Sequence, residues 1–136
     1  HAGLVKLASR LVVPTRLTFE LARRLEIHPE LVQYEDFLPY LIGITHTDME
    51  FFFALLREAM AHDATDVLPT LHDVPTVVIA GLRDRMIHAV RSEAMAAQIP
   101  SAHYVAIEDG SHVTPIERAE RVNDAIAALL SRVEQN

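Results

Sequence analysis

The sequence predicts an α/β fold: two parallel strands with flanking helices, preceded by a helical region. Residues 74–81 (VPTVVIAG) and 102–109 (AHYVAIED) are short apolar runs typical of buried strands, and residues 88–98 between them suit a helix. A strand, a helix and a second strand in this order give a right-handed crossover and two neighbouring parallel strands. Residues 1–68 have helical character throughout. We therefore expect a helical unit over residues 1–68 and an α/β unit over residues 69–136.

Leucines recur at helical spacing in the first part of the helical unit, in two runs separated by Pro14. They are Leu4, Leu7, Leu11, Leu17, Leu21 and Leu25. Residues 36–43 (DFLPYLIG) are apolar but contain Pro39. This combination predicts either a short helix or an irregular packed segment.

A capping box is predicted at residues 47–50 (TDME), where the Thr47 hydroxyl would accept from the first helical turn and Glu50 would reach back. The helix that follows carries one apolar stripe, made of Met49, Phe52, Phe53, Leu56 and Met60. Such a stripe usually faces a protein core. If the helix covers a ligand site instead, its inner face would contact the ligand.

Turn residues mark the ends of the elements in the α/β unit. Gly81 ends the first strand, Pro100 follows the helix, and residues 109–110 (DG) end the second strand. Residues 114–117 (TPIE) predict a second capping box with Pro at the first helical position. The last helix has an apolar face of Val122, Ile126, Leu129, Leu130 and Val133.

The composition describes an acidic, core-forming chain of one domain's length, with 136 residues and a net charge of −7. No cluster of Lys and Arg is apparent along the sequence, which argues against a nucleic-acid surface. The absence of cysteine excludes disulfides and thiolate chemistry. No apolar run approaches the roughly 18 residues that a membrane span needs, and no signal pattern is apparent. These features favour a cytoplasmic location without deciding the compartment.

Two polar residues follow the predicted strands, at the edge of a parallel sheet where ligands usually bind. Asp84 comes just after the first strand and His112 just after the second. Neighbouring strands lie about 4.8 Å apart, so these side chains can meet. A carboxylate that holds one histidine nitrogen orients the ring for general-base catalysis. The alternative is that Asp84 caps a helix and His112 bonds to local backbone.

The same region resembles the C-terminal part of an α/β-hydrolase. VPTVVIAGLRDRM, then a helix, a strand and DGSHVTPIERAERVNDAI, together cover about residues 69–135. The resemblance implies that Asp84 is the catalytic acid of a triad and His112 its base. It also implies that residues 1–68 correspond to the cap, which is inserted before the acid-bearing strand and shapes the substrate pocket.

The sequence departs from this family at the nucleophile. The family's G-x-S-x-G elbow is absent, because the only glycines are Gly3, Gly43, Gly81 and Gly110. The oxyanion-hole loop is absent too, Ser111 replaces the glycine common before the histidine, and His88 stands where proline is frequent. We expect the chain, which starts at His1, to be a fragment that lacks the nucleophile-bearing N-terminal half and is inactive alone.

Other residues are weaker candidates for catalytic or metal-binding groups. The serines are Ser9, Ser92, Ser101, Ser111 and Ser131, and none has a suitable position; Ser111 is nearest but is adjacent to His112 in sequence. His62 and Asp63, with His28 and His46, suggest a metal-dependent phosphohydrolase of the HD type as a remote alternative. Adjacent residues diverge by about 100° around a helix, which disfavours His62 and Asp63 as joint ligands. No metal or cofactor is expected.

The resemblance implies a serine esterase or lipase that hydrolyses a small or medium apolar ester. Phe52, Phe53 and Met60 are the weakly predicted substrate contacts on the cap. The alternatives are an epoxide hydrolase, a dehalogenase, a carbon–carbon hydrolase or a non-catalytic scaffold with the same architecture. Two parallel strands leave open sheet edges. We expect these to be covered by the N-terminal half of the same protein or by self-association.

Overall fold

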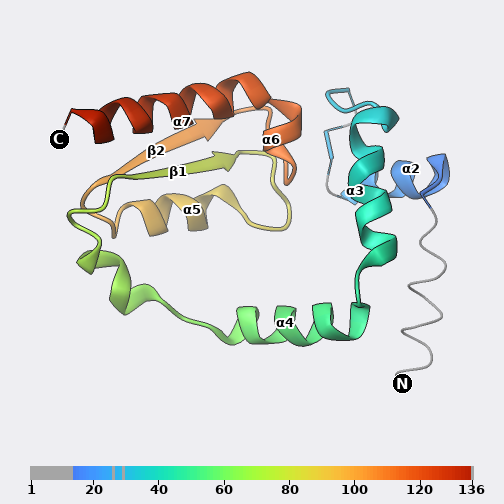
Figure 1. The fold of residues 1–136 in the computed structure, drawn as a ribbon, viewed down its shortest axis with the longest axis horizontal. Helices are drawn as coiled ribbons and strands as arrows, with labels where there is room; N and C mark the ends of the chain where they lie inside the picture. Colours follow the sequence, from blue (N-terminus) through green and yellow to red (C-terminus); the bar gives the residue numbers. More distant parts are fainter. Residues whose placement is uncertain (1–13, 26, 29, 136) are drawn as a thin grey trace.

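The computed structural model describes residues 14–25, 27–28 and 30–135, and these residues form a mixed α/β structure (Figure 1). The first helices are α2 (Arg16–Leu25), α3 (Tyr34–His46) and α4 (Met49–Ala61), followed by the 3-10 helix η1 (Thr65–Thr70). The α/β part contains β1 (Thr76–Gly81), α5 (Ala89–Ala96), β2 (Ala102–Ile107), α6 (Thr114–Glu117) and α7 (Ala119–Glu134). The predicted Leu4, Leu7 and Leu11 run lies outside the described residues.

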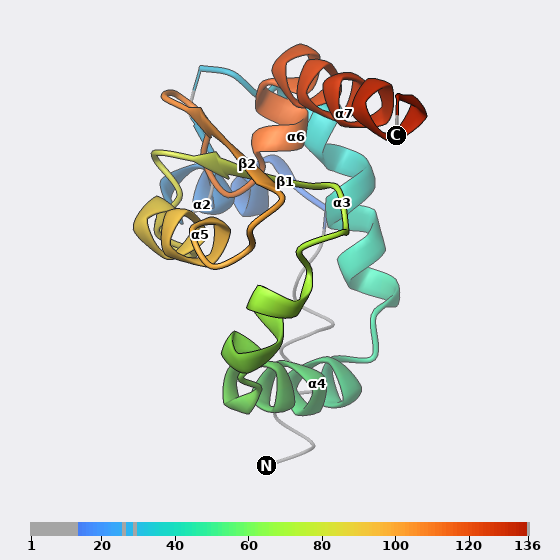
Figure 2. The same cartoon turned by 90° about the vertical axis from the view of Figure 1, so that its left-hand side faces the viewer.

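β1 and β2 pair in parallel, with Thr76 opposite Ala102 and Gly81 opposite Ile107. This confirms the two parallel strands expected from the sequence. The two views show α5 and α7 on opposite faces of this sheet (Figures 1 and 2). Within the described ranges the sheet has only these two strands, so each strand has an open edge.

The helices before the sheet have a core of their own. It consists of Phe19, Ile27, Val32, Phe37 and Leu41, with Val113 from the loop after β2 packed against it. α3 runs without interruption through Pro39, although proline removes one helical hydrogen bond. Phe37 and Leu41 are buried on either side of it, so tertiary packing of this face outweighs the missing bond.

Two expected apolar faces turn out to be exposed. In α2 the buried side chain is Phe19, whereas Leu17 and Leu21 are exposed. In α4 no residue is buried: Phe52 and Phe53 are 43% and 51% exposed, and Met60 is 80% exposed. The periodicity predicted both helices correctly, but in α4 nothing among the described residues covers the stripe.

The two predicted capping boxes are wrong. α4 is capped by Asp48, whose carboxylate accepts from the N–H groups of Glu50 and Phe51 at 3.0 and 3.2 Å. The Thr47 hydroxyl donates instead to the Gly43 carbonyl of the preceding helix. A carboxylate accepts more strongly than a hydroxyl at a helix N-terminus, so the adjacent Asp48 takes the capping position.

The second predicted capping box, at residues 114–117, does not form either. The Thr114 hydroxyl donates to the Ser111 carbonyl at 2.5 Å, and Glu117 binds partners other than the start of its own helix.

None of the described helices is long and apolar enough to cross a membrane.

Candidate active site

The ends of β1 and β2 approach each other closely where two glycines face one another. The Leu82 N–H donates to the Ile107 carbonyl and the Arg83 N–H to the Gly110 carbonyl, both at 2.9 Å. A Cβ on Gly81 would lie 2.5 Å from the carbonyl carbon of Gly110 and would also collide with the Thr114 hydroxyl. Only glycine therefore allows the loop after β1 to run this close to the loop after β2.

This approach places Asp84 and His112 within hydrogen-bond distance. His112 Nδ1 lies 3.1 Å from Asp84 Oδ2. The Asp84 side chain is 13% exposed and the His112 side chain 32%. The residues predicted to meet across the strand ends therefore do meet. Nδ1 is occupied by the carboxylate, and Nε2 is left to face other groups.

The other carboxylate oxygen of Asp84 is bonded to the backbone of its own loop. Oδ1 accepts from the N–H groups of Met86 and Ile87, each at 2.8 Å. Burial alone raises the pKa of Asp84, but the hydrogen bonds from Ile87, His112 and Met86 outweigh it and hold the pKa below its ordinary value. Asp84 is thus a carboxylate at neutral pH, with one oxygen for the backbone and one for the imidazole. Of the two alternatives posed from the sequence, the contact with the histidine occurs, whereas Asp84 caps no helix: α5 begins at Ala89 with His88 as its N-cap, and Asp84 bonds instead to backbone within the loop after β1.

A buried glutamate holds the loop that carries His112. Glu117 is 6% exposed, and its Oε1 accepts from the His28 N–H at 2.6 Å and from the Ser111 hydroxyl at 2.5 Å. Its Oε2 accepts from the Ser111 N–H at 2.5 Å. Sequence reasoning assigned Glu117 to a capping box and missed this role. No local signal could have revealed the bond to His28, which lies 89 residues away along the chain.

The serines in the described part of the chain have other positions. The buried Ser111 hydroxyl donates to Glu117. The Ser101 hydroxyl donates to the carbonyls of Leu71 and Val74, before the start of β1, and the Ser131 hydroxyl donates within α7. Ser92 lies on α5. Ser9 lies outside the described residues.

The remaining predicted residues do not join Asp84 and His112. Phe52, Phe53 and Met60 lie on α4, which both views place apart from the carboxyl ends of the strands (Figures 1 and 2). For the metal alternative, the part of the chain that the structure describes contains no grouping of three His, Asp or Glu side chains suited to a metal ion. Asp63 instead accepts from the N–H and hydroxyl of Thr65 at the start of η1.

Comparison with known proteins gives one informative result. No family model and no curated protein matches the sequence. Among solved structures, a thermophilic esterase from Thermogutta terrifontis, determined with malate bound, matches with a TM-score of 0.64 and 30% sequence identity. The match covers 95% of this chain and 48% of the esterase, so the chain spans about half the esterase's length. The chain has a hydrolase-like fold.

Proposed function

We propose that this chain carries the acid and the base of a carboxylic ester hydrolase, with Asp84 and His112 in a Ser-Asp-His triad. The observation that carries the proposal is the bond between His112 Nδ1 and the partly buried Asp84 carboxylate at the ends of two parallel strands. The structural similarity to an esterase over almost the whole chain supports the same conclusion.

In the proposed mechanism Asp84 keeps the proton of neutral His112 on Nδ1, which leaves the Nε2 lone pair available as the general base. Nε2 takes the proton of a serine hydroxyl as the serine oxygen attacks the ester carbonyl carbon. The imidazolium then donates that proton to the leaving alcohol oxygen as the carbon–oxygen bond breaks. Asp84 stabilises the imidazolium because its lowered pKa keeps it charged.

The serine and the oxyanion hole are proposed to come from chain outside this sequence. The sequence has no G-x-S-x-G, and about half of the similar esterase has no counterpart in it. The open edges of the two-stranded sheet offer the place where further strands would pair. A small apolar ester is the proposed substrate, with Phe52, Phe53 and Met60 of α4 as contacts that the complete protein would bring to the site.

The test measures hydrolysis of p-nitrophenyl esters and labelling by a fluorophosphonate on the full-length protein. His112→Ala and Asp84→Asn should each lower kcat by about 10⁴-fold, since loss of the base or of its orienting carboxylate has that order of effect. The matched control is His103→Ala, because His103 is exposed at the amino end of β2, away from the carboxyl ends that carry Asp84 and His112.

Equal hydrolysis by the parent and His112→Ala would exclude the proposed base. Absence of both labelling and ester hydrolysis in the parent would exclude a serine esterase. Turnover of an epoxide or haloalkane in that case would indicate an aspartate nucleophile on the same fold, and absence of any turnover would indicate a non-catalytic scaffold.

A further inference from the structure

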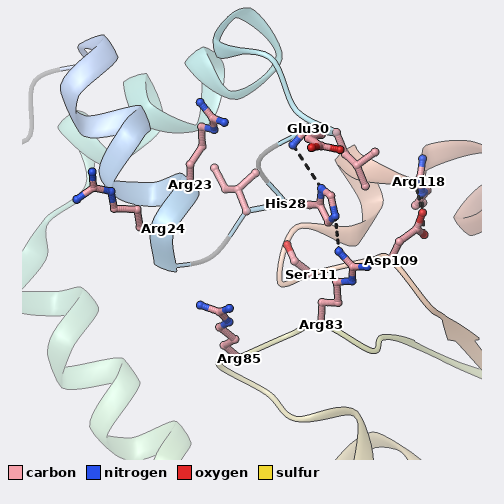
Figure 3. Close-up of a pocket in the computed structure, with 11 residues that line it drawn as sticks. Arg23, Arg24, His28, Glu30, Arg83, Arg85, Asp109, Ser111 and Arg118 are labelled. Atoms are coloured by element: carbon pink, nitrogen blue, oxygen red, sulfur yellow. Dashed lines mark hydrogen bonds and ion pairs between the residues drawn. The ribbon is translucent and has the colours of Figure 1, made fainter.

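A cavity lined by arginines lies between α2 and the loops after β1 and β2 (Figure 3). Its volume is about 630 Å³. Five of the chain's twelve basic residues line it, against two of its nineteen acidic ones. The arginines are Arg23 and Arg24 from α2, Arg83 and Arg85 from the loop after β1, and Arg118 from the junction of α6 and α7. No such cluster is visible along the sequence, because the fold assembles it from three separate segments.

Two of these arginines are neutralised by carboxylates. Arg23 pairs with Glu20 at 2.8 Å. Arg118 forms a two-pronged pair with Asp109, and these hydrogen bonds hold the pKa of Asp109 below its ordinary value; the charge of Arg83 adds to that effect. Asp109 is therefore bonded directly to Arg118, and its charge acts on Arg83 without an ion pair between them.

The other three arginines form no ion pair with a carboxylate of the described residues. In the described portion of the protein, no carboxylate lies within 4.0 Å of the guanidinium groups of Arg24, Arg83 or Arg85. Arg83 does have a partner, His28, whose Nε2 lies 2.6 Å from its Nη1. A guanidinium only donates, so the His28 ring is the acceptor in this contact. This contact positions Arg83 without removing its charge.

His28 in turn is fixed to the body of the protein through its backbone. Its N–H donates to the buried Glu117 at 2.6 Å. The series of hydrogen bonds from Glu117 through His28 to Arg83 therefore holds one guanidinium in place. Arg85 lies two residues further along the same loop (Figure 3). A cation that is positioned before its ligand arrives loses less conformational entropy on binding.

We propose that this cavity is a binding site for a small multivalent oxyanion, such as a phosphoryl group or a dicarboxylate. A guanidinium binds a phosphoryl group or a carboxylate through paired N–H donors. Several guanidiniums without a directly paired carboxylate around one cavity favour a ligand with more than one negative charge. The ligand is a small molecule because the rest of this chain is strongly acidic and repels an extended polyanion. The cavity adjoins the Asp84–His112 pair, but this proposal does not depend on the proposed ester hydrolysis.

The test titrates the purified protein with inorganic pyrophosphate and, separately, with succinate by isothermal titration calorimetry at constant ionic strength. We expect saturable binding of at least one probe. Arg85→Gln should weaken it about tenfold, because one charge-assisted contact is lost, a change of about 1.4 kcal/mol. The matched control is Arg91→Gln on α5, which removes the same charge from an exposed position outside the cavity and should change the affinity less than about twofold.

Tighter binding of pyrophosphate would assign the site to a phosphoryl compound, and tighter binding of succinate to a dicarboxylate. Absence of saturable binding of both probes at millimolar concentration would overturn the proposal. So would equal weakening in Arg85→Gln and Arg91→Gln, since that result indicates general charge attraction. Because binding is measured without turnover, a failed esterase assay leaves this result interpretable.

Discussion

Glu117 provides the sharpest test of how the His112 loop is held. In Glu117→Ala the N–H groups of Ser111 and His28 lose their acceptor, whereas the Ser111 hydroxyl can rotate toward another one. Each buried donor left unpaired costs about 1–3 kcal/mol, so the substitution should lower the free energy of unfolding by about 2–6 kcal/mol. That is a large share of the roughly 5–15 kcal/mol that stabilises an ordinary domain.

The milder substitution Glu117→Gln removes the charge of this side chain but keeps its shape. It keeps one acceptor oxygen but turns an amide NH₂ toward one of three donors, so we expect a loss of about 1–3 kcal/mol. The assay is urea unfolding followed by circular dichroism, with Glu120→Gln as the control because Glu120 is exposed in the first turn of α7. If Glu117→Gln and Glu120→Gln shift the midpoint equally, the buried carboxylate does not hold this loop and the argument fails.

Two further predictions concern the strand ends. The pKa of Asp84 is lowered in the fold, so its contribution to stability is present above the ordinary value of 3.8 and is lost as the pH falls through the lowered one. Asp84→Asn should therefore lose less thermal stability than the parent when the pH is lowered from neutral to acid, as measured by the thermal unfolding midpoint. An equal loss of stability in both proteins would contradict this. Gly81→Ala should cost at least about 1–3 kcal/mol, because its Cβ would lie 2.5 Å from Gly110 backbone. Gly43→Ala, in α3 with nothing within 4 Å of the new Cβ, should stabilise by about 1 kcal/mol, and the two midpoints in urea must move in opposite directions.

The sequence predicted the parts of this structure that depend on local pattern. The order of strands and helices from residue 74 onward follows from short apolar runs separated by turn residues, and the parallel pairing follows from the crossover rule. The proximity of Asp84 and His112 also follows, because both stand just after paired strands.

The sequence could not predict what depends on partners distant along the chain. The apolar stripe of α4 has the right period for a helix, but period alone does not specify what covers the stripe. Glu117 fits a capping pattern, yet its carboxylate accepts from the His28 N–H, 89 residues away along the chain. The arginine cavity was missed for the same reason, since its members are scattered between α2 and α7.

These long-range contacts have a consequence for the helical part of the chain. His28 bonds to Glu117 through its backbone and to Arg83 through its ring, and Val113, next to His112, packs against the core that contains Phe37. The helices before the sheet thus contact the loop that carries Asp84, through Arg83. They also contact the loop that carries His112, through Val113. A cap that only covered a substrate would leave the His112 loop to be positioned by the sheet alone. Here the buried bond from Glu117 and the packing of Val113 make the helical segment part of what positions that histidine.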